Sequence, residues 1–426
     1  MKNTLKLELD DAIFPAFASC PRGLEAHLAG ELAELGAFLC EPTGGGAEFE
    51  ASWPTLLRIN LWSRLAGRVG LRIAQAPCRS EEDLYRFALR QPWKQWFGID
   101  QTFRVDVNNI GTRLPNLRFA QLRIKDAICD AFRQETGERP SVRIDAPDVR
   151  VFAGLGVEQV SLYIDLSGEN LFKRGWRAAK GYAPLKENLA AGLLAISAWQ
   201  PAQPLLDPFC GSGTIVIEAA CLAADKAPGL DRSFGFEKLK PHRVDLWEPI
   251  WTQAAKRFET GIAQACANDA LHIHGSDVTR KLIDIARENA IQAGLEPLLA
   301  AGRLQFQQID ARAALPPAAT PGLLLTNPPY GERLRAKGYD DSAHREEAID
   351  GDEGVLDDER YQALFTQLGS QLKRQFAGWR VAILSGDLEV RRALGLSPKR
   401  RTPLYNGDIE CRLFEFPMTA GSFRPA

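Results

Sequence analysis

Short apolar runs alternate with amphipathic segments along the first part of the chain. Residues 12–19 form an apolar run, and the leucines that follow recur at helical spacing, at positions Leu24, Leu28, Leu32 and Leu35. This pattern predicts a strand followed by an amphipathic helix. Further strand signals occupy residues 102–109 and 160–168, with a helical pattern at 119–137. Such mixing predicts a compact α+β module up to about residue 170.

From Lys186 onward, apolar runs alternate regularly with helical patterns. Helices are predicted at 185–199, 213–224, 279–294 and 360–376, and strands at 203–207, 272–277, 304–310, 322–327, 379–387 and 411–416. Strands that alternate with helices are typical of a mostly parallel sheet covered on both faces. In such sheets ligands bind outside the carboxyl ends of the strands, where the strand order reverses. The second part is therefore predicted to be a Rossmann-like α/β domain.

Composition restricts the class of protein. The chain has 426 residues, 45% hydrophobic and 25% charged, with a net charge of −2, which is typical of a globular protein of more than one domain. No apolar run is long enough for a membrane helix, and the acidic N-terminus lacks a signal-peptide pattern. We therefore expect a cytoplasmic protein. The 8 cysteines and 5 histidines show no metal-ligand spacing, so no metal is expected.

A glycine-rich turn follows the first strand of the second part, in the sequence Leu205-Leu-Asp-Pro-Phe-Cys-Gly-Ser-Gly213. The turn has neither dinucleotide-binding nor Walker spacing, and no lysine follows it to meet phosphates. Asp207 would repel a pyrophosphate but attract an ammonium group. A ligand with an ammonium and a carboxylate, such as S-adenosylmethionine, fits better than a nucleotide. The predicted binding residues are Asp207, Pro208, Cys210, Gly211 and Gly213.

Acidic residues end the next two predicted strands. Asp277 follows residues 272–276 and is placed to accept both hydroxyls of a ribose. Asp310 ends the strand after it, where it can accept a hydrogen bond from an adenine amine. Each aspartate has a plain alternative role as a helix cap. Because the carboxyl ends of parallel strands share one edge, we expect both residues to lie beside Asp207.

The fourth strand ends in Asn327-Pro328-Pro329-Tyr330. An amine on an aromatic ring is a poor nucleophile, because its lone pair is delocalised. The Asn327 side-chain oxygen and the Pro328 carbonyl can both accept its N–H groups and orient the lone pair toward a methyl donor. Proline fixes φ and so presets that carbonyl, and Tyr330 can stack on a flipped-out base. These four residues are the predicted catalytic set.

With these motifs the chain resembles the class I S-adenosylmethionine-dependent methyltransferases that modify exocyclic amines. The segments 17–37, 162–194 and 405–416 further resemble the THUMP-domain methyltransferases that form N2-methylguanosine, and among them those acting on bacterial 23S rRNA. The resemblance implies a ferredoxin-like segment and a THUMP RNA-binding domain (about 44–165) within residues 1–185, followed by a methyltransferase domain at 186–418. It also implies that Lys186, Glu187 and Asn188 flank the cofactor, although these residues could simply start a helix.

Two clusters free of acidic residues, 112–125 and 170–186, are interleaved with aromatic residues. Most charge clusters are solvated faces, but arginines beside aromatic rings also grip RNA phosphates and stack on unpaired bases. The predicted RNA-binding residues are Arg113, Arg118, Arg123, Lys125, Lys173, Arg174 and Arg177.

Several alternatives remain open from the sequence. A guanine in 23S rRNA is the first choice of substrate, and a tRNA guanine is the runner-up. DNA adenine comes third, since adenine-N6 methyltransferases share the Asn-Pro-Pro-Tyr motif. An inactive RNA-binding assembly factor is the alternative from a different class. The acidic segment 338–359 is predicted to be a solvated loop, with a lid as one reading. The longest family members carry a second methyltransferase domain, whose activity is not expected here.

Overall fold

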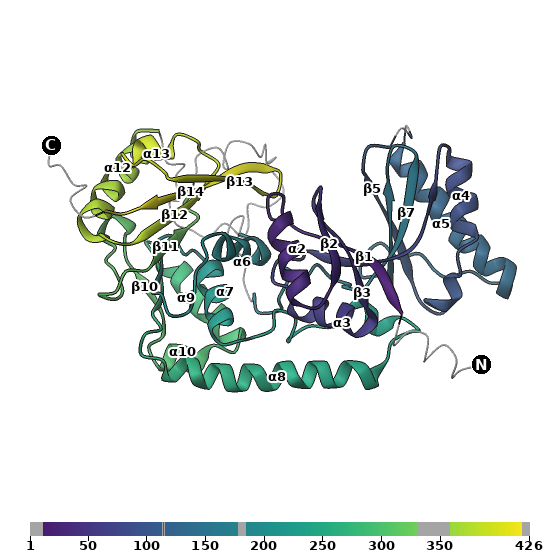
Figure 1. Cartoon of the computed structure of the whole chain (residues 1–426), viewed down its shortest axis with the longest axis horizontal. Helices are drawn as coiled ribbons and strands as arrows, with labels where there is room; N and C mark the ends of the chain where they lie inside the picture. Colours follow the sequence, from purple (N-terminus) through teal and green to yellow (C-terminus); the bar gives the residue numbers. More distant parts are fainter. Residues whose placement is uncertain (1–11, 113, 115, 178–184, 330–357, 420–426) are drawn as a thin grey trace. The chain divides into compact units, whose positions relative to one another are not determined.

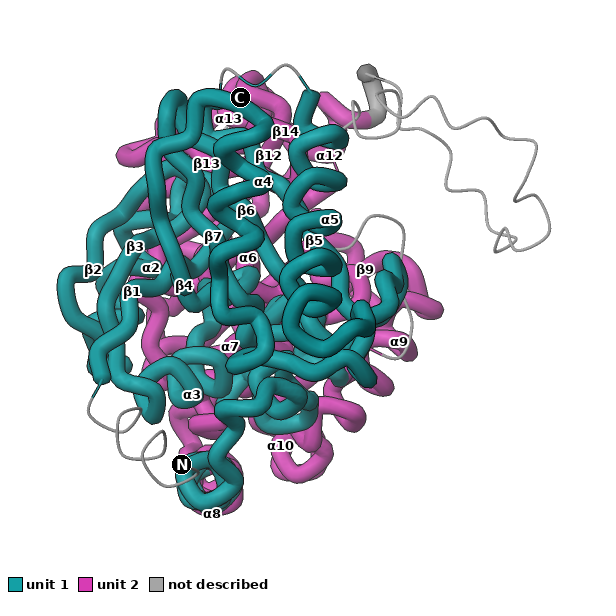
Figure 2. The backbone as a smooth tube through the Cα atoms, turned by 90° about the vertical axis from the view of Figure 1, so that its right-hand side faces the viewer, with its two compact units in different colours: residues 1–175, 227–257 teal, residues 176–226, 258–426 magenta. Residues whose placement is uncertain are grey.

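The computed structural model of the chain describes residues 12–112, 114, 116–177, 185–329 and 358–419. The chain divides into two compact units, coloured separately in Figure 2. Unit 1 holds residues 1–175 and 227–257, and unit 2 holds residues 176–226 and 258–426. The division predicted from sequence, 1–185 and 186–418, stays a prediction about domains. The compact units differ from it in residues 176–185 and 227–257.

Unit 1 is built on one seven-stranded sheet with the strand order β2-β3-β1-β4-β7-β6-β5. Neighbouring strands are antiparallel except β5 and β6, which are parallel. The strands are β1 (Ile13–Ser19), β2 (Phe38–Thr43), β3 (Gly46–Ser52), β4 (Arg68–Pro77), β5 (Phe103–Asn109), β6 (Val149–Leu155) and β7 (Gln159–Asp165). The α+β module predicted from the sequence is confirmed.

Helices complete unit 1, and α4 and α5 pack together beside β5 (Figure 1). Leu24, Leu28 and Leu32 are fully buried, so the predicted leucine spacing does mark the inner face of α2. The helices are α2 (Glu25–Glu34), α3 (Trp53–Trp62), α4 (Glu81–Leu89), η1 (Trp93–Gln95), α5 (Leu117–Thr136) and η2 (Gly235–Lys238).

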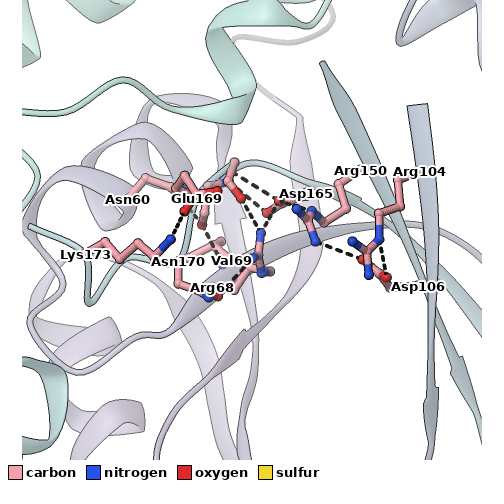
Figure 3. Close-up of polar contacts among 12 residues, drawn as sticks. Asn60, Arg68, Val69, Arg104, Asp106, Arg150, Asp165, Glu169, Asn170 and Lys173 are labelled. Atoms are coloured by element: carbon pink, nitrogen blue, oxygen red, sulfur yellow. Dashed lines mark hydrogen bonds and ion pairs between the residues drawn. The ribbon is translucent and has the colours of Figure 1, made fainter. Parts of the chain in front are cut away.

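A chain of alternating charges crosses the sheet of unit 1 (Figure 3). Arg68 on β4 donates to the buried carboxylate of Asp165 at the end of β7, at 2.5 Å. Arg150 on β6 lies 4.0 Å from the same carboxylate and pairs with Asp106 at 3.0 Å. Arg104, opposite Arg150 in the β5–β6 register, donates to Asp106 at 2.7 Å. These pairs link β4 to β7, β7 to β6 and β6 to β5 across the sheet.

Residues 227–257 belong to unit 1, although the residues before and after them, 176–226 and 258–426, belong to unit 2. Arg232 fixes this excursion, because its guanidinium donates to the backbone carbonyls of Ser167 (3.2 Å), Glu169 (2.7 Å), Asn170 (2.6 Å) and Lys173 (3.1 Å). The excursion ends in α8 (Val244–Ala267), a long helix that the sequence analysis did not predict.

Unit 2 has a second seven-stranded sheet with the order β10-β9-β8-β11-β12-β14-β13. The first five strands in this order are parallel, and β14 is antiparallel to both of its neighbours. The strands are β8 (Leu205–Asp207), β9 (Ile273–Asp277), β10 (Leu304–Gln308), β11 (Leu323–Thr326), β12 (Arg380–Ser385), β13 (Arg400–Asn406) and β14 (Ile409–Pro417). All six predicted strands are present, whereas β13 was missed.

The strand order reverses at β8, because the chain adds β9 and β10 on one side and β11 and β12 on the other. This reversal places the expected ligand position at the carboxyl ends of β8 and β11. The helices of unit 2 are α6 (Glu187–Ile196), α7 (Thr214–Ala223), α9 (Arg280–Gln292), α10 (Glu296–Ala300), η3 (Ala311–Ala313), α12 (Asp358–Gln375) and α13 (Val390–Ala393). The predicted α/β architecture is confirmed. Residues 358 and 359, predicted to be loop, belong to α12.

Candidate cofactor and substrate site

Polar residues follow neighbouring strands at the carboxyl edge of the unit 2 sheet. Asp207 and Asp277 are the last residues of β8 and β9, and Asn327 directly follows β11. Asp310 lies just beyond the end of β10. Since β10, β9, β8 and β11 are neighbours in this order, the topology brings together the residues that the sequence placed on one edge.

Asp207 is a buried carboxylate, 2% exposed. It accepts hydrogen bonds from the Thr326 hydroxyl at 2.6 Å and from the backbone N–H of Phe209 at 3.1 Å. Burial raises its pKa to about 7, while the Thr326 hydrogen bond acts in the opposite direction and the negative charge of Asp277 adds to the rise. This carboxyl group therefore titrates near neutral pH until a positive charge arrives beside it.

The glycine-rich turn depends on two left-handed backbone positions. Gly211 has φ 52°, and a Cβ built there would meet no atom within 4 Å. Gly213 has φ 86°, and its Cβ would lie 3.1 Å from Ala286 Cβ. The turn is thus open on the Gly211 side and packed closely against α9 at Gly213. Cys210 N donates to Ser276 O at 2.9 Å, which holds the turn against β9; Pro208 and Cys210 are buried.

Asp277 connects this turn to the next one. Its Oδ2 accepts the backbone N–H of Gly211 at 3.1 Å, and its Oδ1 accepts the N–H of Thr279 at 2.9 Å. Each oxygen retains a lone pair for another donor. The structure therefore shows the loop-fixing role of Asp277, and contact with a ribose stays a prediction.

Asp310 is held by its neighbour Arg312. It caps η3 by accepting the N–H of Arg312 at 2.8 Å, and its Oδ2 pairs with Arg312 Nη2 at 2.5 Å. The hydrogen bond from the Arg312 side chain is the main reason that the pKa of Asp310 is lowered. The structure therefore shows Asp310 as a helix cap, which was the alternative role given for it from the sequence. An adenine amine bound to Asp310 would have to share its carboxylate with the Arg312 guanidinium.

The start of α6 lies beside the same turn. Lys186 is its N-cap, and Glu187 and Asn188 are buried in its first turn. Arg177 Nε donates to Glu187 Oε1 at 2.9 Å, and its Nη atoms donate to Ser212 Oγ at 3.2 Å and Thr214 Oγ1 at 3.1 Å. Arg177 was predicted to bind RNA. That assignment stays a prediction, and in this structure the guanidinium is bonded to Glu187 and to the glycine-rich turn.

The Asn-Pro-Pro segment begins where β11 ends. Asn327 is half-buried, Pro328 is buried and Pro329 is exposed, and Tyr330 lies outside the described residues. The preceding Thr326 makes the hydrogen bond to Asp207 described above. One contact thus ties the segment to the glycine-rich turn. Thr326 was not among the residues predicted from the sequence, although its position immediately before the motif was the available signal.

Aromatic side chains also reach this edge. Phe209, from the glycine-rich turn, stacks on Phe365 of α12 with ring centroids 6.4 Å apart and an interplanar angle of 19°. Tyr361 lies 4.6 Å from the Phe365 ring on its helix. Phe365 thus contacts both Phe209 and Tyr361, and nothing in the local sequence pattern distinguished these rings from ordinary core residues.

The other predicted RNA-binding residues differ in their surroundings. Arg174 is 3% exposed and donates to Leu171 O and Arg64 O, and its assignment to RNA stays a prediction. Arg123 pairs with Glu82 and lies over the Tyr85 ring, while Lys125 pairs with Asp126 and Lys173 with Glu169. Arg118 is exposed without a polar partner among the described residues. Arg113 lies outside them.

Within the described part of the chain, no group of acidic, cysteine or histidine side chains could hold a metal ion. The described helices also include none that is long and apolar enough to cross a membrane.

Comparison with protein families gives three matches along the chain. Residues 16–70 match the RlmL ferredoxin-like domain, residues 78–165 the THUMP domain, and residues 174–346 the RMKL-like methyltransferase domain. The chain thus carries, in this order, regions similar to a ferredoxin-like domain, a THUMP domain and an RMKL-like methyltransferase domain. The resemblance drawn from the sequence motifs is confirmed. The THUMP match begins at residue 78, whereas the motifs suggested a start near residue 44.

Individual relatives agree with the family. The Ribosomal RNA large subunit methyltransferase K/L of Syntrophotalea carbinolica is 39% identical over 419 residues, which is 97% of this chain and 55% of the relative. The chain therefore spans about half the length of the curated relatives it matches. Among solved structures, SMU.472 complexed with SAH has a TM-score of 0.79 at 27% identity, covering 97% of this chain and 99% of that one. A "possible methylase" from Clostridium difficile 630 has a TM-score of 0.80 at 28% identity, covering 97% and 100%.

Proposed function

We propose that this chain transfers a methyl group from S-adenosylmethionine to the exocyclic N2 amine of a guanine in 23S rRNA. The observation that carries the proposal is the 2.6 Å hydrogen bond between Thr326 and Asp207. It joins a turn suited to a cationic cofactor to a segment suited to an aromatic amine. The name of the curated relatives supports ribosomal RNA as the substrate.

The described residues fit this cofactor. S-adenosylmethionine carries a sulfonium, an ammonium and a carboxylate, and when bound it supplies an activated methyl group. Asp207 offers a buried carboxyl group whose pKa of about 7 falls when a cation lies nearby. The open side of Gly211 lets a ligand approach the backbone, and the first turn of α7 favours an anionic group. Asp277, Lys186, Glu187 and Asn188 complete the proposed cofactor residues, with Asp310 beside them.

For the reaction itself, the protein orients the amine. The Asn327 side-chain oxygen and the Pro328 carbonyl accept the two N–H groups of the guanine amine and so point its lone pair toward the methyl group. As the C–N bond forms and the C–S bond breaks, positive charge develops on the nitrogen, and both acceptors stabilise it. Tyr330 is proposed to stack on the flipped base. The proton then passes from the product amine to water, so no dedicated base is required.

The test compares substrates directly. Transfer of tritiated methyl groups from the cofactor to purified 23S rRNA, tRNA and DNA should label 23S rRNA most strongly, and mass spectrometry should find the label in N2-methylguanosine. Labelled tRNA guanine or DNA adenine would replace the proposed substrate. Cofactor binding without labelling of any nucleic acid would point instead to an assembly factor and overturn the proposal.

A further inference from the structure

Arg177 makes an unusual number of contacts for a residue from a basic cluster. Its side chain is 12% exposed. Besides its bonds to Glu187, Ser212 and Thr214, its Nη2 donates to the Leu185 carbonyl at 3.3 Å. These bonds use all but one of the five N–H donors of a guanidinium. Arg177 is therefore in no position to grip an RNA phosphate without abandoning the glycine-rich turn.

The contacts join two segments that the proposed cofactor needs. Ser212 and Thr214 lie on either side of Gly213, in a turn whose glycines give the backbone high conformational freedom when unfolded. Leu185 and Glu187 lead into α6. A single planar cation with fixed donor directions holds both segments in one geometry, which a flexible lysine ammonium does not reproduce.

The direction of these bonds also matters. Because the Ser212 and Thr214 oxygens accept hydrogen bonds from Arg177, their own hydroxyl protons remain available to donate to a third group. Both residues are buried at the N-terminal end of α7, Thr214 as its first residue and Ser212 just before the N-cap Gly213, where an anionic group is favoured. Arg177 thus presets two hydroxyl donors without itself having to touch the ligand.

Glu187 depends on the same cation. Burial is the main cause of its raised pKa, and the charge of Arg177 opposes that rise. Removal of Arg177 would leave a buried carboxylate without its compensating charge, which is costly for the ionised form.

We propose that Arg177 is a positioning residue of the cofactor site, which fixes the Ser212–Thr214 turn relative to Glu187 and so sets the affinity for S-adenosylmethionine. This inference rests on the proposed cofactor, but not on the identity of the RNA. Its effect is expected on cofactor binding rather than on the chemical step or on RNA affinity.

The experiment uses the full chain and isothermal titration calorimetry with S-adenosylmethionine alone. Arg177→Met should weaken binding about tenfold or more and raise the KM for the cofactor, with kcat at saturating cofactor and RNA affinity nearly unchanged. Arg177→Lys should recover only part of the affinity. Arg374→Met removes an exposed guanidinium from the last turn of α12 and serves as the matched control, with wild-type affinity expected.

Two further variants keep the test decisive if Arg177→Met is poorly folded. Thr214→Val removes one acceptor and preserves the Arg177–Glu187 pair, so it should weaken cofactor binding in a folded protein. Arg177→Met combined with Glu187→Gln should lose less affinity than the sum of the single changes, because the uncompensated charge is removed. Wild-type cofactor affinity in both Arg177→Met and Thr214→Val would overturn the inference.

Failure of the proposed function gives a different result. If the wild-type chain binds S-adenosylmethionine but methylates no guanine, the substrate assignment fails while the role of Arg177 is still measured by calorimetry. If Arg177→Met binds the cofactor normally but loses RNA affinity with a flatter salt dependence, Arg177 is an RNA contact and the inference is wrong.

Discussion

Two buried aspartates, one in each unit, differ in whether the protein places cationic side chains beside them. Asp165 and Asp207 are both 2% exposed, and burial raises the pKa of each. Asp165 has Arg68 at 2.5 Å, Arg150 at 4.0 Å, and the N–H groups of Ser167 and Gly168 at 3.0 and 3.1 Å (Figure 3). Its compensating charges are built into the sheet.

Asp207 has only the Thr326 hydroxyl and one backbone N–H as hydrogen-bond donors, and none of the described cations pairs with it. A buried carboxylate left without a cation costs stability. Carboxyl groups with strongly shifted pKa values cluster at functional sites, where a bound ligand can supply the missing charge. The difference between the two sites therefore separates a carboxylate that holds strands together from one that we propose receives a cationic cofactor.

The largest expected effect is at the reacting edge of unit 2. Asn327→Ala should lower kcat by about 10²–10³-fold, the loss typical when one preorganised polar group is removed from a reacting centre. Calorimetry should find cofactor affinity within a few fold of wild type, because Asn327 is proposed to contact the substrate amine. A fully active Asn327→Ala variant would remove the proposed role of this side chain.

The next effect is on the stability of unit 1. Arg68→Met should lower the free energy of unfolding by about 3–5 kcal/mol, because it leaves the buried Asp165 partly uncompensated. Urea denaturation measures this change. Asp165→Asn in the same background should recover part of the loss. Arg79→Met, which breaks the exposed pair with Glu158, is the control and should change stability by less than about 1 kcal/mol. If Arg68→Met and Arg79→Met lower the stability equally, the buried charges around Asp165 do not have the stabilising role described above.

The third effect is a pH dependence confined to Asp207. Below its pKa of about 7 the carboxyl group is protonated, so a cationic cofactor must displace a proton. Affinity for S-adenosylmethionine should therefore weaken by up to about tenfold for each pH unit below 7, measured by calorimetry between pH 5 and about 8. Asp207→Asn should flatten this profile, and an unchanged profile would place the titrating group elsewhere.

The same shift predicts the opposite trend for the stability of the cofactor-free protein. The pKa of Asp207 is raised above its ordinary value of 3.8, so the folded state holds the proton more tightly than the unfolded state. Its contribution is fully present below pH 3.8, is lost as pH rises toward about 7, and is constant above that. Urea denaturation of wild type and Asp207→Asn across this range separates this contribution from those of other groups.

The smallest expected effect is on RNA binding by two surface arginines, one with and one without an ion-pair partner. Arg118 is exposed without a described partner, whereas Arg123 pairs with Glu82 and packs on Tyr85. Arg118→Met should weaken rRNA binding by a few fold and reduce the salt slope by about 1. Arg123→Met should have a smaller effect on the slope. Filter binding at several salt concentrations measures both slopes. A larger change in slope for Arg123→Met than for Arg118→Met would show that an ion pair within the protein does not prevent an arginine from binding RNA.

The local sequence determined much of the fold and of the site. Hydrophobic periodicity located α2, α6, α7, α9 and α12 and the strands that precede the polar residues, because side-chain spacing depends only on nearby positions. The glycines at 211 and 213 and the prolines at 328 and 329 could be interpreted for the same reason, since they restrict the backbone at their own positions.

Only the tertiary structure decided how the charges are used. Arg174, Arg177 and Lys173 belong to one basic cluster, yet the first is buried on carbonyls, the second holds the glycine-rich turn and the third forms an exposed ion pair. Asp207 and Asp165 likewise look alike in sequence. The partner of a charge lies far away along the chain, as Thr326 does from Asp207, and it is known only after distant strands have come together. For that reason the sequence by itself indicated the chemistry of this protein, whereas the folded chain determined which residues are placed to perform it.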